Sequence, residues 1–224
     1  HKFSAEMVLE DLFLGSDAGS LEKVDNNDGT FTMSYTATVA GTYNMAIIYN
    51  KEHISGSPFQ VLVLPAQISI SHSQISGEGS GTVIAGGEGT FTILAKDRFG
   101  NVQIYRPRAT NPFTALISGP VTAEPNFKDF KDSSYVAFYN VTVSGRYSIR
   151  IESGDSVLDK ALIVKPAESW AGTSYINSSM LSVTAGVSQY VELTVRDIYS
   201  NILVAPETES EITSIECTII PDGP

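Results

Sequence analysis

Residues 30–43 read TFTMSYTATVAGTY, residues 134–147 read SYVAFYNVTVSGRY, and this pair of stretches decides the fold. In both, apolar and polar side chains alternate before the chain reaches the pattern Val-x-Gly-x-Tyr. Such alternation is typical of a half-buried antiparallel strand. The glycine permits a tight turn, and the tyrosine hydroxyl can bond to the nearby backbone, as in a tyrosine corner. The sequence therefore predicts the same strand, corner and strand twice, 104 residues apart.

The repeat extends beyond this pair. Residues 85–101 match residues 185–201 at an offset of 100, and residues 64–66 match residues 165–167 at an offset of 101. A period near 100 residues is about the size of one immunoglobulin-like sandwich. The first pair belongs to the back of a unit and the others to the front, which sets the phase of the repeat. We therefore predict the C-terminal half of a repeat in 1–65, a complete repeat in 66–166 and the N-terminal half of a further repeat in 167–224.

The coarse secondary structure is expected to be all β, as tandem immunoglobulin-like sandwiches. In the middle repeat the patterns predict strands near residues 67–73, 81–84, 90–97, 113–118, 121–128, 134–141, 146–152 and 158–165. The best helical candidate is residues 6–13, which we interpret instead as a strand that continues into a loop, because the surrounding patterns are β.

Composition excludes several classes of protein. The chain has 224 residues and a net charge of −11, with only 14 Lys and Arg. That balance argues against nucleic-acid binding and against docking on an anionic membrane surface, since both need clustered cations. The single cysteine, Cys217, excludes an intrachain disulfide framework and a cysteine-based zinc site. No apolar run reaches the roughly 18 residues of a membrane span. The chain opens at His1 without a signal-peptide pattern, so we expect it to be an excerpt of something longer.

The sequence contains no recognisable catalytic or cofactor motif. The three histidines form no metalloprotease pattern, and no nucleophile elbow is present. Residues 77–81 (GEGSG) lack the Lys and Ser/Thr of a phosphate loop, so we interpret them as a bend between strands. Residues 25–29 (DNNDG) lack the EF-hand spacing and predict a hairpin turn. Calcium binding between adjacent repeats is left open as an alternative. We expect no enzyme activity and no cofactor.

Four motifs together carry a family resemblance. Residues 25–31 (DNNDGTF), Tyr35, residues 39–43 (VAGTY) and residues 53–59 (HISGSPF) resemble the filamin-type immunoglobulin-like repeat. The middle repeat resembles the family's opening and the third unit keeps part of it. The matching positions, which we expect to be structural, are Asp28, Gly29, Tyr35, Gly41, Tyr43, His53, Gly56, Ser57, Pro58, Phe59, Gly86, Asp97, Gly100, Asn101, Gly145 and Tyr147.

Two departures indicate a distant relative rather than an actin-cross-linking filamin. Residues 153–160 (SGDSVLDK) stand where the family has Gly-Ser-Pro-Phe, and residues 131–134 (KDSS) replace its Asp-Gly turn. The window also holds no calponin-homology segment, so the resemblance does not imply actin binding.

The resemblance implies a structural rod or scaffold segment that mediates protein–protein interaction. In filamin-like repeats the partner commonly adds a strand to an exposed sheet edge, where main-chain bonds supply the affinity. The matching groove would lie between residues 113–118 and 121–128. The alternative interpretation is that these are ordinary core and edge residues with no binding role. The candidate groove residues are Phe113, Ala115, Ile117, Val121 and Ala123. Expected partners are other proteins and the neighbouring repeats of the same chain, with polymer or filament assembly left open.

Two sequons support an alternative function. Asn140-Val141-Thr142 and Asn177-Ser178-Ser179 match the N-glycosylation pattern. Glycans there would indicate an adhesive or fibre-forming ectodomain of the same fold. The low Lys and Arg content and the many Ser and Thr favour an extracellular or cell-surface location over a cytoskeletal or ciliary one.

Overall fold

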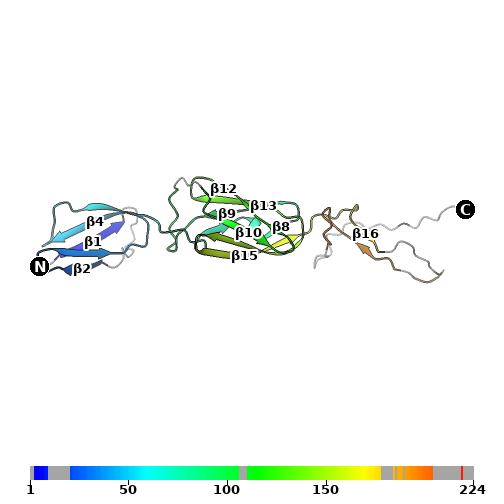
Figure 1. Cartoon of the computed structure of the whole chain (residues 1–224), viewed down its shortest axis with the longest axis horizontal. Helices are drawn as coiled ribbons and strands as arrows, with labels where there is room; N and C mark the ends of the chain where they lie inside the picture. Colours follow the sequence, from blue (N-terminus) through cyan, green and yellow to red (C-terminus); the bar gives the residue numbers. More distant parts are fainter. Residues whose placement is uncertain are drawn as a thin grey trace.

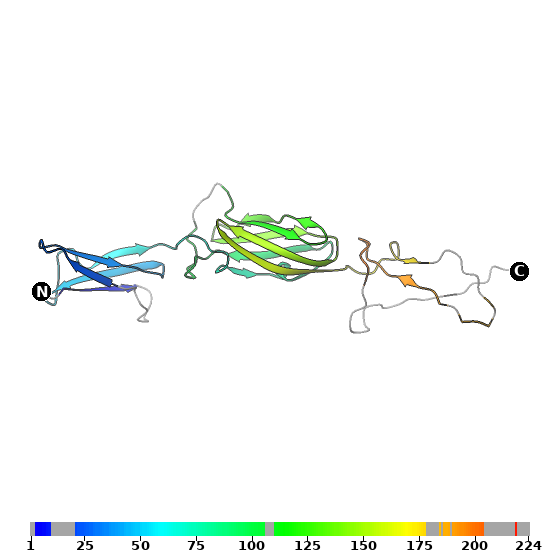
Figure 2. The same cartoon turned by 60° about the horizontal axis from the view of Figure 1, so that its bottom comes forward.

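A computed structural model describes residues 21–105, 110–177, 184, 186–188, 190–203 and 218, and the backbone of 3–9. Among these residues the regular elements are strands and one short 3₁₀ helix. Figures 1 and 2 show three groups of strands that follow one another along the long axis. No helix in this described part is long and apolar enough to cross a membrane. The chain is therefore all β, as the alternating patterns predict.

The first group contains a sheet and a hairpin. The sheet has the order β1-β4-β5, and β6 also pairs with β4. Its strands are β1 (Phe3–Leu9), β4 (Gly41–Tyr49), β5 (Glu52–His53) and β6 (Phe59–Val63). The hairpin joins β2 (Leu21–Asp25) to β3 (Phe31–Tyr35). The strand interpretation of residues 6–13 is confirmed for residues 6–9, and residues 10–13 lie outside the described part.

The turn of this hairpin shows why its sequence folds locally. The Asp28 carboxylate accepts hydrogen bonds from the Thr30 amide at 2.9 Å and from the Thr30 hydroxyl at 2.6 Å. Gly29 has a φ of 89°, which favours glycine. The predicted hairpin turn at residues 25–29 is confirmed.

The middle group is a sandwich of two sheets. One has the order β12-β13-β9-β7 and the other the order β11-β10-β14-β15-β8. The strands of the first are β7 (Gln74–Ser76), β9 (Glu88–Leu94), β12 (Asn126–Asp129) and β13 (Ser134–Asn140). Those of the second are β8 (Thr82–Ile84), β10 (Thr114–Ser118), β11 (Thr122–Ala123), β14 (Gly145–Ser153) and β15 (Ser156–Lys165).

The core fills the space between these two sheets. Alternate residues of each long strand are buried, so β14 follows the burial pattern that its sequence alternation predicts. Phe113 packs edge-on against Tyr135 with ring centroids 5.0 Å apart. Burial of one such apolar side chain stabilises the fold by about 1.5–3 kcal/mol. The fully buried large residues of this core include Phe91, Phe113, Ile70, Ile93, Ile117, Ile149, Ile151, Leu162 and Val164.

Two strand predictions for the middle group are wrong. Residues 67–73 form an isolated bridge and a turn, in which the Ser73 amide donates to the Ser69 carbonyl at 3.0 Å. Serine side chains in this segment bond to the local backbone and so compete with a strand ladder. The predicted strand 121–128 is divided into β11 and β12, which belong to different sheets. Pro125 lies between them and cannot donate to a ladder.

The third group is small in the described part. It contains β16 (Tyr175–Ile176), which pairs with β17 (Leu193–Thr194). Cys217 and the sequon residues Ser178 and Ser179 lie outside the described residues.

Candidate interaction site

The candidate groove meets one edge of the five-stranded sheet. β10 pairs with β14 along all of Thr114–Ser118, but β11 pairs with it only at Ile117 and Ser118. Among the strands that the structure describes, none pairs with the outer edge of Thr114–Leu116. An edge of this kind presents main-chain hydrogen-bonding groups to a further strand.

The five candidate groove residues do not share one environment. Phe113 and Ile117 are core residues with exposures of 2% and 0%. Ala115 and Ala123 are partly buried against the same core, whereas Val121 is 39% exposed. Phe113 and Ile117 therefore belong to the core beneath the groove. Ala115, Val121 and Ala123 are the candidates that can contact an added strand with their side chains.

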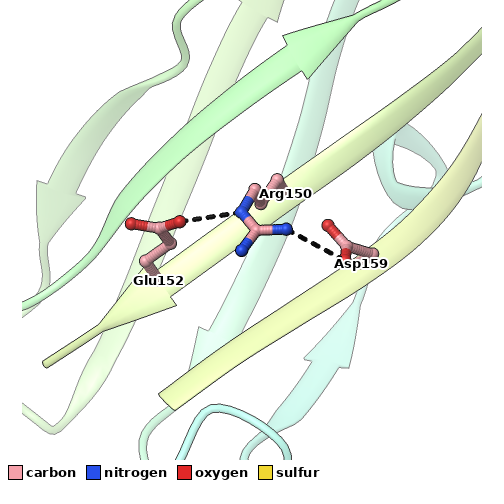
Figure 3. Close-up of polar contacts among 3 residues, drawn as sticks. All are labelled: Arg150, Glu152 and Asp159. Carbon is pink, nitrogen blue, oxygen red and sulfur yellow. Dashed lines mark hydrogen bonds and ion pairs between the residues drawn. The ribbon is translucent and has the colours of Figure 1, made fainter. Parts of the chain in front are cut away.

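The outer face of the same sheet carries a charged cluster. Arg150 on β14 donates to Glu152 at 2.8 Å and to Asp159 on β15 at 3.3 Å (Figure 3). All three side chains are about half exposed, at 50%, 47% and 55%. Ion pairs in water contribute little to stability. The two carboxylates serve a surface ion-pair network here, and no group of potential metal ligands was found in the described part of the chain.

The tyrosine corners are present at both predicted places. The Tyr43 hydroxyl donates to the Val39 carbonyl at 2.8 Å, and the Tyr147 hydroxyl donates to the Val143 carbonyl at 2.7 Å. Both rings are buried, and burial raises the pKa of both hydroxyls. Each corner is thus closed by the bond that its sequence predicts.

Residues 53–59 form a separate polar turn. Ser57 accepts a hydrogen bond from the Ile47 amide at 2.7 Å and lies 3.0 Å from the His53 ring nitrogen. Gly56 has a φ of 86°, and the Ser57–Pro58 peptide is cis. Phe59, which follows, begins β6 and is 41% exposed. His53 is thus placed in a turn beside Ser57.

Asp97 and Asn101 lie in a loop at the end of the middle group that faces the first group. Four hydrogen bonds end on the Asp97 carboxylate, from the amides of Ala66, Phe99 and Asn101 and from the Asn101 side chain. Burial alone would raise the pKa of Asp97, but these hydrogen bonds outweigh it and hold the pKa below its ordinary value. Gly100 in this loop has a φ of 87°. The carboxylate is therefore a fixed acceptor at physiological pH.

The sequence match between residues 85–101 and 185–201 placed a second copy of this loop, but it did not predict the contacts of the loop or one buried bond of the core. Asp197 and Asn201 make the same set of contacts one period later. Both copies share the spacing Asp-x-x-x-Asn, which is part of the repeat in the sequence. The Tyr139 hydroxyl donates to the Gly79 carbonyl at 2.5 Å, and burial raises its pKa to about 12. No local pattern links these two residues, because 60 positions separate them.

The two sequon asparagines are both exposed. The Asn140 side-chain amide donates to the carbonyls of Gly86 and Gly87 at 2.8 and 3.3 Å. The Asn177 backbone amide donates to the Glu192 backbone carbonyl at 3.2 Å. Asn140 is therefore engaged by the neighbouring loop through the atom that would carry a glycan.

Comparison with known proteins adds the family. The filamin/ABP280 repeat model matches residues 11–60 and 67–160. Rat Filamin-C is 34% identical over 131 residues, which cover 58% of this chain and 4% of Filamin-C. Protein GAMETE EXPRESSED 2 of Arabidopsis thaliana is 55% identical over 42 residues, or 19% of this chain and 5% of that protein. The chain thus spans only a small part of the relatives it matches.

Solved structures support the same fold. FdeC, an Escherichia coli adhesin, aligns over 88% of this chain and 62% of the solved chain, with a TM-score of 0.51 and 21% identity. Likeness at this level of identity concerns the fold alone. The repeat model covers more than half of the sequence, and the strands form an all-β sandwich with two tyrosine corners. The chain belongs to the filamin/ABP280 repeat family and is a distant member of it.

Proposed function

We propose that this chain is a non-catalytic segment of a tandem-repeat rod or scaffold, and that its middle repeat binds other proteins by strand addition. The observation that carries the proposal is the outer edge of Thr114–Leu116, which β11 leaves uncovered. An incoming extended peptide bonds to such an edge through its main chain, while alternate side chains select the sequence. Filamin repeats as a family mediate protein interactions, which supports this choice.

The groove geometry narrows the kind of peptide. Ala115 and Ala123 have small side chains, so a strand can approach β10 closely, and Val121 offers an apolar contact at the rim. We expect a peptide of alternating apolar and polar residues whose apolar side chains face Ala115 and Val121.

The proposal can be tested with peptides selected from a random display library against the whole chain. Amide hydrogen exchange then locates the bound peptide. We expect new protection at Thr114–Leu116 and no change at β7 or β8. Protection at another edge, or selection of no binding peptide, contradicts strand addition at β10.

A matched pair of variants separates the groove from the general surface. Ala115→Asp places a charge in the groove, and Ala161→Asp places the same charge on the exposed face of β15. We expect the first to abolish peptide binding and the second to retain it, with both variants checked for cooperative unfolding. Equal binding by a folded Ala115→Asp variant would exclude this groove.

The exposure of both sequon asparagines favours a second candidate, an adhesive or fibre-forming ectodomain. Intact-mass measurement of the native protein before and after glycosidase treatment tests it. A mass loss that maps to Asn140 or Asn177 supports an extracellular location, and unmodified peptides at both positions contradict it. The Asn140 side-chain amide is already hydrogen-bonded to the Gly86 and Gly87 carbonyls, so we expect Asn177 to carry the larger share of glycan.

A further inference from the structure

The first two groups of strands are joined by one side chain as well as by the linker. The Asn101 side-chain oxygen accepts a hydrogen bond from the Ala40 amide at 2.9 Å. Its side-chain nitrogen donates to the Thr38 carbonyl at 2.8 Å. Thr38 and Ala40 belong to the tyrosine corner of the first group, while Asn101 belongs to the middle group. A single amide thus satisfies a main-chain donor and a main-chain acceptor of the preceding unit.

The next junction repeats this arrangement one period later. The Ser144 amide donates to the Asn201 side-chain oxygen at 2.8 Å, and the Asn201 side-chain nitrogen donates to the Thr142 carbonyl at 2.8 Å. Asn201 belongs to the third group, and Ser144 lies in the corner of the middle group. Both bonds recur between equivalent atoms, and their lengths agree within 0.1 Å, so the junction is a recurrent interface.

A buried aspartate orients each asparagine. Asp97 and Asp197 have no exposed surface. Each accepts a bond from the asparagine side-chain nitrogen, at 2.8 and 2.7 Å. Each also accepts a bond from the linker, from the Ala66 or the Ala167 amide, at 2.8 Å. The aspartate therefore holds the asparagine side chain and the linker in place relative to each other, through bonds that do not involve the corner.

The corner contributes only main-chain atoms to these bonds. Among the corner residues that bond to the asparagine, one side chain differs between the two junctions, with alanine at position 40 and serine at position 144. The corner backbone is held in shape from behind by Tyr43 or Tyr147. The bonds are therefore the same with alanine or serine at this position, and the tyrosine closes the corner in both cases.

We propose that the Asp-x-x-x-Asn loop is a docking site for the tyrosine corner of the preceding repeat, and that it couples successive repeats in one fixed orientation. This coupling is distinct from the binding of other proteins at the β10 edge. It uses the Asp-x-x-x-Asn loop, and its partner is the preceding repeat of the same chain. The asparagine bonds only to main-chain atoms of the corner. We therefore expect that any repeat with a closed corner can precede any repeat with this loop.

A close approach at the second junction agrees with this coupling. A Cβ placed on Gly86 would lie 2.0 Å from the Tyr199 hydroxyl oxygen, so the ring of Tyr199 rests on this glycine. Tyr199 lies within the Asp197–Asn201 loop, and Gly86 lies in the middle group. A side chain at position 86 would require the Tyr199 ring to move from this place.

Amide hydrogen exchange on the whole chain tests the proposal. In the wild type we expect the Ala40 and Ser144 amides to be protected. Asn101→Ala should accelerate exchange at Ala40 by about tenfold, the equivalent of one lost hydrogen bond, and leave Ser144 unchanged. The Asn101 amide should stay protected, because Asp97 still accepts from it. Small-angle scattering should show a broader range of overall lengths for this variant.

Two further variants complete the design. Asn111→Ala is the matched control, because it removes an asparagine bond within the middle group, at 2.9 Å from the Phe113 amide. It should leave Ala40 protected. The exchange of corner residues, Ala40→Ser with Ser144→Ala, should leave both amides protected. Rapid exchange at Ala40 in the wild type, unchanged protection in Asn101→Ala, or lost protection in the corner exchange would each overturn the proposal.

Discussion

At the scale of single residues, several buried polar groups of this chain are paired by specific hydrogen bonds. The tyrosine corners and the Asp-x-x-x-Asn loops place hydroxyl, carboxylate and amide groups out of water, and each finds a partner. A buried polar group without a partner costs about 1–3 kcal/mol. The partners are therefore strict requirements of the fold, and they can be tested one at a time.

The corner tyrosine of the middle group gives the first such test. Tyr147→Phe keeps the buried ring but removes the hydroxyl that bonds to Val143. We expect the free energy of unfolding to fall by about 1 kcal/mol, the typical net value of one hydrogen bond. Denaturant titration followed by circular dichroism measures it. Tyr35→Phe, at a position that is 41% exposed, should change it little. Equal effects of the two substitutions would contradict the corner's role.

The two aspartates predict a pH dependence. The pKa of Asp97 and of Asp197 is lower in the folded chain than the ordinary 3.8. A lowered pKa contributes stability above the unfolded value, and this contribution is lost as the pH falls through the folded value. The chain should therefore lose stability between about pH 5 and pH 2, as measured by urea titration across that range. An Asp97→Asn variant should lose less over the same interval, and an identical slope would argue against Asp97 as a cause.

At the scale of elements, short segments set the position of the long strands. The 3₁₀ helix η1 (Glu78–Ser80) lies against β9, and Gly79 within it is buried. The bend expected at residues 77–81 is thus a tight turn with a packing role. A Cβ on Gly79 would lie 2.3 Å from the Thr90 backbone nitrogen, which cannot move without shifting the strand.

Two neighbouring glycines make this packing testable. Gly79→Ala should destabilise the fold by about 1–3 kcal/mol, the usual cost of overpacking a core. Gly81→Ala is the matched control, because its nearest neighbour would be the Glu78 carbonyl oxygen at 3.8 Å. Thermal unfolding of both variants measures the difference. A similar loss from both substitutions would mean that the close approach at Gly79 is not the cause.

At the scale of the whole molecule, the described residues of the middle group form a closed core. Its cluster of buried residues runs from Ile68 to Val164 and includes residues from both sheets. The division into two partial repeats around a complete one stays a prediction. A half sandwich exposes its inner face and unpaired edges.

The division predicts which pieces fold alone. A fragment of residues 66–166 should unfold in one cooperative transition, because it contains the whole cluster. A fragment of residues 1–65 should show no such transition. Calorimetry of the two fragments measures this. A cooperative transition from residues 1–65 alone would overturn the phase of the repeat.

The sequence alone determined what depends on neighbours in the chain. Period-two alternation predicted the strands of the long hairpin β14–β15, and Val-x-Gly-x-Tyr predicted both corners with their hydroxyl bonds. The Asp-Gly turn between β2 and β3 followed in the same way.

Only the tertiary structure decided what depends on residues that are distant along the chain. Alternation says that one side of a strand is apolar, but not which sheet the strand joins, so the division of residues 121–128 at Pro125 was missed. Likewise, the motif containing Asn101 was visible, but its partner Ala40 lies 61 positions away in another repeat. A side-chain amide bonds to whichever backbone the fold brings within about 3 Å of it, and no local pattern records that distance.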